Sequence, residues 1–284
     1  MASARRPRLA LLAAGTGNDL AFATGVPAHD LDAALAIALG ARERAIDVGE
    51  VDGVHFVNCA GFGFDAEVLR GTQGVTWLRG HAVYLLTAAR KLFAYRGFEA
   101  ALTYPAEGEG APAVFPRAHH LAVVVSNGPR FGGGFLIAPG ATVEDGLLDV
   151  VRVADGPAWR RIAVFAGATR GTHIGAPEVS RRTVREVTLT FDAPPLFDAD
   201  GELHQAREST LTVRCHQGAL RLADCSAPWS ARRSTCDVRV RLAARTGRTS
   251  DRGGGGHRGP RRRASPLATT RSRRSGAHRQ PQRR

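Results

Sequence analysis

Short apolar runs separated by glycine-rich turns constrain this chain more than any other feature. The first run, at residues 9–14, leads through the glycine turn at 15–17 into a helix start at 18–23, which is an α/β pattern. The later runs have the length and spacing of β-strands. Because a lone strand and two helices cannot form a doubly wound sheet, the chain is predicted to begin inside an α/β domain and to continue as a β-rich domain.

The expected elements follow from local signals. Asp30 is a good N-cap for a helix over residues 31–39, where leucine occupies every fourth position. The turn Asp52-Gly53 between the runs 46–51 and 54–58 predicts a β-hairpin. Two more helices are expected over residues 79–93 and 158–168, and strands near 98–104, 121–126, 147–153, 187–191, 210–213 and 219–222.

The net charge of +13 comes from the end of the chain. Residues 230–284 contain 17 Arg and two Asp, which leaves a net charge of −2 on residues 1–229. This segment is rich in glycine and poor in apolar residues, so it cannot bury enough surface to fold and is predicted to be disordered. Its arginines could bind anionic lipid or nucleic acid. We favour an extension without evolved function, because GC-rich coding DNA read in a wrong frame gives such a composition.

Three parts are therefore predicted: the remnant of an α/β domain at residues 1–45, a β-rich domain at 46–229 and a disordered basic tail at 230–284. No run of 18 apolar residues is present, which excludes a helical membrane span, and the run at 9–14 is too short for a secretory signal. We expect a cytoplasmic protein. Its four cysteines are widely spaced and predict isolated thiols rather than disulfides or a zinc site.

The segment Gly15-Thr16-Gly17-Asn18-Asp19 lies where the first apolar run meets a helix start. Its two glycines allow the backbone to approach a ligand closely. The free N–H groups at the helix start, together with the Thr16 hydroxyl, suit a phosphate group. Asp19 could hold a metal ion or fix the turn. Glycine turns are common, so an ordinary strand–helix turn with an Asn/Asp cap is the alternative.

Four further features contain glycine, acidic residues or both. In Asn58–Ala66, glycines alternate with aromatics before a helix opens at Asp65; the segment either borders a binding site or ends a strand with a buried Phe pair. Three glycines at 132–134 suit a loop close to a ligand. Asp145-Gly146 is either a plain turn or a source of oxygen ligands for Mg²⁺. The turn Asp198-Ala199-Asp200-Gly201-Glu202 is either a solvated acidic turn or the place where a carboxylate accepts the proton of an attacking hydroxyl.

The order of these segments resembles the diacylglycerol kinase catalytic family, which includes bacterial lipid kinases and sphingosine-kinase-like enzymes. The resemblance covers roughly residues 8–223, and its most specific parts are residues 15–19 and the segment around Asp145. It implies an N-terminal α/β domain that binds ATP and a C-terminal β-sandwich domain that helps to form a lipid cleft. The implied reaction transfers the γ-phosphoryl group of ATP, with Mg²⁺, to the hydroxyl of a lipid such as diacylglycerol at a membrane surface.

On the nucleotide side, the resemblance assigns the nucleotide contacts to residues 15–19. Thr16 matches the family's nucleotide-contacting threonine, and Asp19 matches an acidic residue near the phosphates and the metal. Asp47, in Ala-Ile-Asp-Val-Gly, resembles the acidic position that joins this polar network.

On the acceptor and metal side, Glu202 matches the family's proposed proton acceptor, and Asp200 belongs to the same Asp-Gly-Glu motif. Asp145 matches a structural Mg²⁺ ligand, with the backbone carbonyls of Thr142 and Leu147 as two more. The glycine turn at 15–19, Asp145 and Glu202 are therefore expected to converge on one cleft.

One motif of the family, the phosphate loop Gly-Gly-Asp-Gly-Thr, does not occur in the 284 residues. Because phosphoryl transfer depends on positioning and charge neutralisation, we expect this chain to be weakly active or inactive and a complete product to start further upstream. A NAD kinase-like enzyme, which shares that loop, and a non-catalytic binder of nucleotide or anionic lipid are the alternatives. Binding of nucleic acid through the tail is disfavoured, because the body is nearly neutral and lacks interleaved aromatics.

Overall fold

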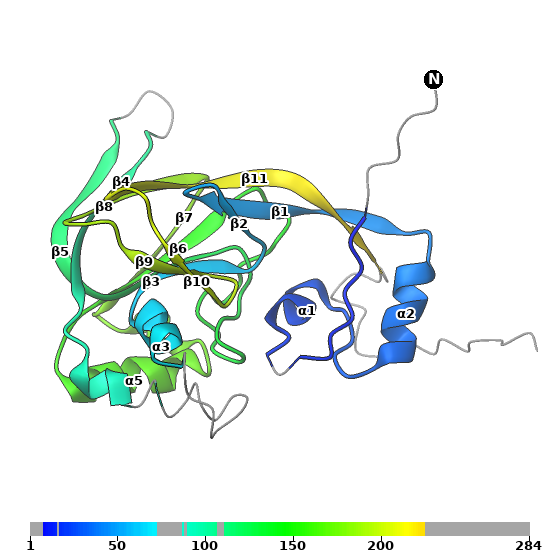
Figure 1. Cartoon of the computed structure of the whole chain (residues 1–284), viewed down its shortest axis with the longest axis horizontal. Coiled ribbons are helices and arrows are strands. Elements are labelled where there is room, and N and C mark those ends of the chain that lie inside the picture. The colour runs from blue at the N-terminus through cyan, green and yellow to red at the C-terminus, as the bar shows by residue number, and fades with distance from the viewer. Residues whose placement is uncertain (1–7, 16, 73–86, 88–89, 107–110, 225–284) are drawn as a thin grey trace, which may run out of the picture. The chain divides into compact units, whose positions relative to one another are not determined.

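A β-sandwich makes up most of the computed structural model, which describes residues 8–15, 17–72, 87, 90–106 and 111–224 (Figure 1). Its strands are β1 (Glu43–Val51), β2 (Val54–Phe56), β3 (Cys59–Gly63), β4 (Phe98–Tyr104), β5 (Ala113–Ser126), β6 (Leu148–Ala154), β7 (Val179–Val184), β8 (Glu186–Phe191), β9 (Leu196–Ala199), β10 (Glu202–Gln205) and β11 (Thr210–Ala223). Helices among these residues are α1 (Asp19–Thr24), α2 (Leu31–Leu39), α3 (Phe64–Thr72), α5 (Ala158–Ala168) and a 3-10 turn at Thr172–Gly175.

The 14-residue strand β5 connects the two layers of the sandwich. Its first half pairs with β4, while its second half lies between β3 and β6, and all of these pairings are antiparallel. From β3 the sheet continues to β9 and β10; from β4 it continues through β8, β11 and β1 to β2. The sheet therefore folds over on itself, and the two layers face each other across a common core (Figure 1).

Both faces of β5 are buried in its second half. Val123 and Val125 belong to the core between the two layers of the sandwich. Val124 points the other way, as the two-residue period of a strand requires, and shares a second core with Val68 of α3 and Val164 of α5. The two helices thus cover the outer face of the strands that lead to the candidate site.

The hairpin predicted at residues 46–58 is confirmed as β1, a two-residue turn and β2. Asp52 and Gly53 have φ values of 52° and 79°, the left-handed values that a type I′ turn requires at both central positions. On its other edge β1 pairs with β11 over its whole length, from Val51 opposite Val213 to Glu43 opposite Ala223. These two strands run from the sandwich to the neighbourhood of α1 and α2 (Figure 1).

Other predictions from local signals are also confirmed. The helix α2 spans residues 31–39, and the Asp30 side chain accepts a hydrogen bond from the Ala33 amide at 2.9 Å. The helix α5 and the strand β4 have the expected ranges. Cys59 is buried and Cys215 is partly buried, and both are free thiols. Cys225 and Cys236 lie outside the described residues, as does the tail.

Two predictions are wrong. The run at 9–14 forms no strand, because only Leu9 and Ala13 pair and they do so as isolated bridges with different segments of the chain. The expected strands at 210–213 and 219–222 are one strand, β11, because residues 214–216 continue to pair with β1 before a bulge. β1 also begins at Glu43, so the domain boundary predicted at residue 45 falls inside a strand.

Local signals do not predict β3, β7, β9 or β10. Glycine and charged residues interrupt the apolar pattern of these strands, and pairing within the sheet overrides their weak preference. Most of the helix expected over residues 79–93 lies outside the described residues. The described residues in and next to this range, 87 and 90–94, are helical. No described helix has the length and apolar character needed to cross a bilayer.

Candidate functional site

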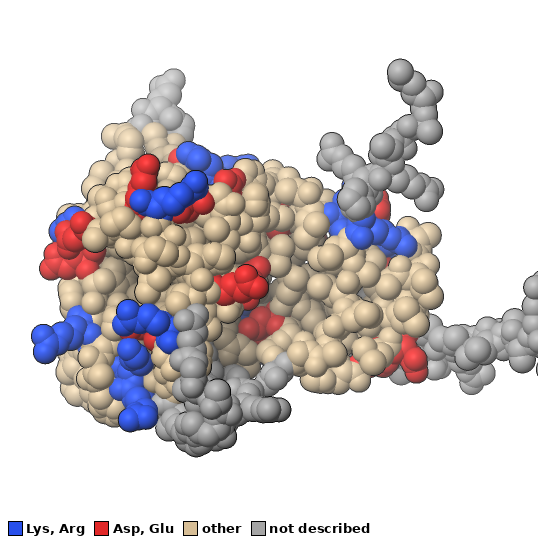
Figure 2. Space-filling model, viewed as in Figure 1, with Lys and Arg blue, Asp and Glu red and all other residues tan. Residues whose placement is uncertain are grey.

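A cavity of about 530 Å³ lies where four loop segments meet. Figure 2 shows acidic side chains in the middle of the view, where the surface is hollowed between the sandwich and α1. The cavity is lined by the start of α1, the connection from β2 to β3, the triple-glycine loop and the turn from β9 to β10; the lining residues are Gly17 to Leu20, Val57 to Cys59, Leu69, Phe131 to Gly133, Asp198, Asp200 and Gly201.

The start of α1 is held against the triple-glycine loop. Asp19 accepts a hydrogen bond from the Gly133 amide at 2.8 Å. A Cβ at Gly17 would lie 3.1 Å from the Gly133 Cα, so this approach of two backbones leaves little room for a side chain at position 17. Asn18 has a left-handed φ of 53° and donates its side-chain amide to the Gly15 carbonyl at 2.7 Å. The expected glycine turn therefore borders the cavity, while Thr16 lies outside the described residues.

The triple-glycine loop adopts a backbone that other residues rarely take. Gly132, Gly133 and Gly134 have φ values of 60°, 76° and 150° in succession. Phe131 and Phe135 close the loop by a pair of backbone hydrogen bonds of 2.9 and 3.0 Å. The glycines thus serve both the fold of the loop and its contact with α1.

The acidic turn is fixed through Asp200. Its carboxylate accepts hydrogen bonds from the amides of Val57, Asn58 and Cys59 at 2.7, 2.9 and 3.0 Å. Burial raises the pKa of Asp200, and these three amides oppose the rise by stabilising the charged form. Three of its acceptor positions are taken by backbone amides, and through them Asp200 holds the turn in place.

Two buried carboxyl groups lie side by side next to the cavity. Asp65, at the start of α3, packs directly over Gly61, and Gly61 is the strand partner of Asp198. Burial raises the pKa of both groups. The charge of Asp198 raises the pKa of Asp65 further, and the charge of Asp200 raises the pKa of Asp198 further. Neither oxygen of Asp65 has a hydrogen-bond partner of good geometry within the described residues. The nearby amides at the start of α3 offset only part of the loss of solvation.

Sequence reasoning missed this pair of carboxyl groups. The available signal was Gly61, because a Cβ at that position would overlap the Asp65 carboxylate. Asp65 also borders a second, small apolar cavity of about 30 Å³ beneath α5, whose wall includes Phe131. Because Phe131 also lines the large cavity, the two cavities share a wall.

The expected convergence of three sites is only partly observed. Residues 17–19 and the turn that carries Asp200 meet at the cavity. Glu202 is exposed at the start of β10, one residue beyond the lining residue Gly201, and does not itself line the cavity. Asp145 is also exposed and does not line the cavity. Its loop is instead bonded to Asp47, whose carboxylate accepts a hydrogen bond from the Gly146 amide.

A buried hydrogen-bond network joins Asp47 to the cavity wall. The Asp47 carboxylate accepts from the amides of Gly146 and Gly218 at 2.6 and 2.7 Å. The side-chain amide of Asn127 donates to the carbonyls of Asp47 and Val57 at 2.9 and 2.8 Å. Since the Val57 amide donates to Asp200, the network runs from the Asp145 loop to the acidic turn.

The Asp145 loop has the donor set of a site for a hard cation. Burial, followed by the charges of Asp47 and Asp149, raises the pKa of Asp145, while the Leu147 amide, which donates to its carboxylate at 3.0 Å, opposes the rise. A cation bound by this carboxylate and by the carbonyls of Thr142 and Leu147 would offset that repulsion. In donor chemistry alone, these oxygen atoms suit a Mg²⁺ or Ca²⁺ ion.

Two family models match the chain. The YegS C-terminal NAD kinase beta sandwich-like domain matches residues 58–224, and the diacylglycerol kinase catalytic domain matches residues 1–51. The first match begins at β3, close to the cavity, and the second ends at the last residue of β1.

Relatives with the name "probable lipid kinase YegS-like" are similar to large parts of the chain. The protein from Pseudomonas aeruginosa is 40% identical over 147 residues, which cover 50% of this chain and 44% of that protein. The protein from Chromohalobacter salexigens is 33% identical over 206 residues, 69% of this chain and 64% of that protein. The chain thus spans about half to two thirds of the length of these relatives.

A solved structure from Bacillus anthracis, described as a "putative diacylglycerol kinase", has a similar fold. Its TM-score is 0.60 at 20% sequence identity, over 78% of this chain and 70% of that chain. At this identity the likeness concerns the fold alone.

The substitution Asp65→Asn tests the buried carboxyl pair. Because burial and Asp198 raise the folded-state pKa of Asp65, the folded protein keeps a proton that the unfolded chain has already released. The stability from this group is complete below the unfolded pKa and is lost as the pH rises through the folded pKa. We expect the gain in Tm from Asp65→Asn over the wild type to be at least about 3 °C larger at pH 9 than at pH 5, by thermal unfolding.

The exposed residue Asp32 provides the control, because Asp32→Asn removes the same charge from the surface. A Tm difference for Asp65→Asn that is equal at the two pH values would contradict a raised pKa for Asp65.

Proposed function

Because this chain belongs to the diacylglycerol kinase family of lipid kinases, we propose that it serves ATP-dependent transfer of the γ-phosphoryl group to a lipid hydroxyl, with diacylglycerol as the acceptor. The observation that carries the proposal is the cavity at which the glycine turn, the triple-glycine loop and the acidic turn meet. Phosphoryl transfer is catalysed mainly by positioning and by neutralising charge. The close approach of these segments suits the first, and carboxylates at the cavity would serve the second only by holding a metal ion.

The nucleotide is proposed to lie against residues 15–19 and the triple-glycine loop. Gly17, Gly132 and Gly133 line the cavity and carry no side chain that would keep a phosphate group away from the backbone; the Gly133 amide itself donates to Asp19. Asp19 is proposed to act near the phosphates and their metal ion. Its hydrogen bond to the Gly133 amide supports this role, because it ties the two segments of the phosphate site together.

Glu202 is proposed to accept the proton of the lipid hydroxyl. Its carboxylate is exposed beside the cavity and makes no hydrogen bond or ion pair within the described residues, whereas that of Asp200 is committed to three amides. A free carboxylate next to the reacting groups is what general-base catalysis requires. Mg²⁺ bound with ATP would supply positive charge to the transferred phosphoryl group, and a second Mg²⁺ at the Asp145 loop would stabilise the fold.

The outer side of α5 is proposed to rest on the membrane that holds the lipid. Trp159 and Ile162 lie one turn apart on α5 and are 65% and 46% exposed. Phe93 is 68% exposed and belongs to a neighbouring segment, because Arg161 of α5 donates hydrogen bonds to the carbonyls of Leu92 and Tyr95. Arg160 lies 5.0 Å from the Trp159 ring centre. Figure 2 shows Lys and Arg side chains over this part of the molecule. Exposed aromatic residues among basic ones suit the surface of an anionic bilayer.

The proposed activity is tested with [γ-³²P]ATP, Mg²⁺ and either diacylglycerol in mixed micelles or NAD. We expect label in the lipid and none in NAD, at a low turnover because no Gly-Gly-Asp-Gly-Thr loop occurs in the sequence. In a longer product that includes the Gly-Gly-Asp-Gly-Thr loop, Glu202→Gln should lower the rate at least about 100-fold, the effect of a lost general base.

The control for this assay is Glu208→Gln, an exposed acidic residue that does not line the cavity and should keep the wild-type rate. Label in NAD would favour a NAD kinase-like enzyme. ATP binding without any labelled acceptor, even in a product that includes the Gly-Gly-Asp-Gly-Thr loop, would favour a non-catalytic protein that binds nucleotide or anionic lipid.

The double substitution Trp159→Ala with Ile162→Ala tests the membrane surface. We expect its partition onto phosphatidylglycerol vesicles to fall at least about tenfold, because two side chains no longer insert. Co-sedimentation at about 0.3 M salt measures this partition while weakening the attraction of the arginine-rich tail. Leu35→Ala with Leu39→Ala, which removes exposed leucines from α2, is the matched control. An equal loss in both double variants would contradict a specific surface on α5.

A further inference from the structure

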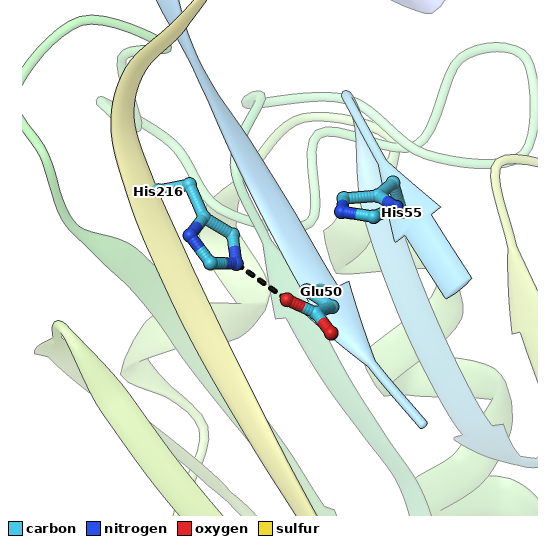
Figure 3. Close-up of side chains that lie close together, drawn as sticks. All are labelled: Glu50, His55 and His216. Carbon is cyan, nitrogen blue, oxygen red and sulfur yellow. Dashed lines mark hydrogen bonds and ion pairs between the residues drawn. The ribbon is translucent and has the colours of Figure 1, made fainter. Parts of the chain in front are cut away.

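Three metal-binding side chains lie together on the sandwich, away from the lining of the large cavity (Figure 3). Glu50 comes from β1, His55 from β2 and His216 from β11, which are adjacent strands of one sheet. Glu50 is directly opposite His55. His216 is opposite Val48, two residues from Glu50, so all three side chains stand on the same face of the sheet.

The geometry of these side chains suits a shared ligand. One donor atom from each residue lies within 4.8 Å of the other two. His216 Nε2 is 2.6 Å from a Glu50 carboxylate oxygen, and the two imidazole rings are 6.1 Å apart between centres. Donor atoms around a tetrahedral Zn²⁺ ion lie about 3.3 Å from one another. Side-chain rotations that move the donor atoms by roughly 1 Å would therefore bring them to the distances that the ion requires.

We propose that Glu50, His55 and His216 bind a first-row divalent transition metal ion such as Zn²⁺. Two imidazole nitrogens and one carboxylate form a set that Zn²⁺, Ni²⁺ and Cu²⁺ prefer over Mg²⁺, which favours oxygen ligands. The site is therefore distinct in chemistry from the oxygen-rich Asp145 loop. Its partly exposed position leaves room for a water molecule as the fourth ligand.

The scaffold around the three side chains favours a defined site. Strand pairing fixes the three Cα positions, so little backbone ordering is needed on binding. Arg214, which is opposite Glu50 on the same face, donates to Glu186 of β8 at 2.5 Å and is thereby partly neutralised. A positive ion at Glu50 consequently meets limited repulsion.

A bound ion would connect the hairpin to the strand on its other side. β2 pairs with β1, and the ion would add a link from His55 to His216 on β11. Two residues after His55, the Val57 amide donates to Asp200 in the wall of the large cavity. The metal site would thus stiffen the short strand that leads into the cavity wall.

The alternative is a plain ion pair between His216 and Glu50, with His55 as a bystander. The two readings differ in what His55 does. A plain ion pair needs only His216 and Glu50, and zinc would not stabilise it. The metal site, in contrast, loses a ligand when His55 is replaced.

The test is calorimetric titration of Zn²⁺ into the full chain after removal of metals with EDTA. We expect His55→Ala to weaken binding at this site at least about tenfold, because losing a ligand costs at least as much as losing one of its supporting groups. His216→Ala and Glu50→Gln should act likewise. Zinc at 100 times its Kd should raise the wild-type Tm by at least about 4 °C and should raise that of His55→Ala less.

The matched control is His119→Ala, because His119 also pairs with a carboxylate, that of Asp155 at 3.3 Å, but belongs to no group of three ligands among the described residues. Histidines elsewhere in the chain contribute equally to every variant. The proposal would be overturned if His55→Ala kept the zinc affinity and the zinc-induced Tm shift of the wild type. It would also be overturned if His119→Ala lost as much zinc affinity as His55→Ala.

Discussion

The Asp200 carboxylate is the contact on which the candidate site depends. It accepts the amides of three consecutive residues, 57–59, and so fixes the turn between β9 and β10 onto the connection between β2 and β3. Asp200 itself has a left-handed φ of 51°, a strained backbone that these hydrogen bonds hold in place. Without them the acidic turn would lose its position at the cavity wall, and Glu202 would lose its relation to the other segments.

Several acidic side chains gather around this contact in the described part of the protein. Asp65, Asp198 and Asp200 all have a raised pKa, and burial is the first cause for each. Asp47 is fully buried and reaches the same wall through Asn127. Burying several carboxyl groups together is costly. A cation or a bound proton lowers that cost, which fits a site built for a phosphate with its metal ion.

Sequence reasoning was sufficient wherever one short segment determines the structure. The Asp30 cap and the Asp52-Gly53 turn each act within a few residues, and both are confirmed. The contact between Asp65 and Asp198 instead depends on the pairing of β3 with β9, and the group of Glu50, His55 and His216 depends on three strands. Asp65 and Asp198, and likewise His216 and the hairpin that carries Glu50 and His55, are more than a hundred positions apart in the sequence, so no local pattern predicts these contacts. The order of the glycine and acidic segments predicted which turns approach one another, but not that Asp145 and Glu202 would lie outside the cavity lining.

The central claim is that the glycine turn and the triple-glycine loop together hold the phosphates of a nucleotide. A crystal structure of the chain with a non-hydrolysable ATP analogue and Mg²⁺ tests it most directly. The account predicts phosphate oxygens within hydrogen-bonding distance of the backbone at residues 17–19 and 132–133, beside the acidic turn. Phosphates bound elsewhere, with this cavity filled only by solvent, would contradict it.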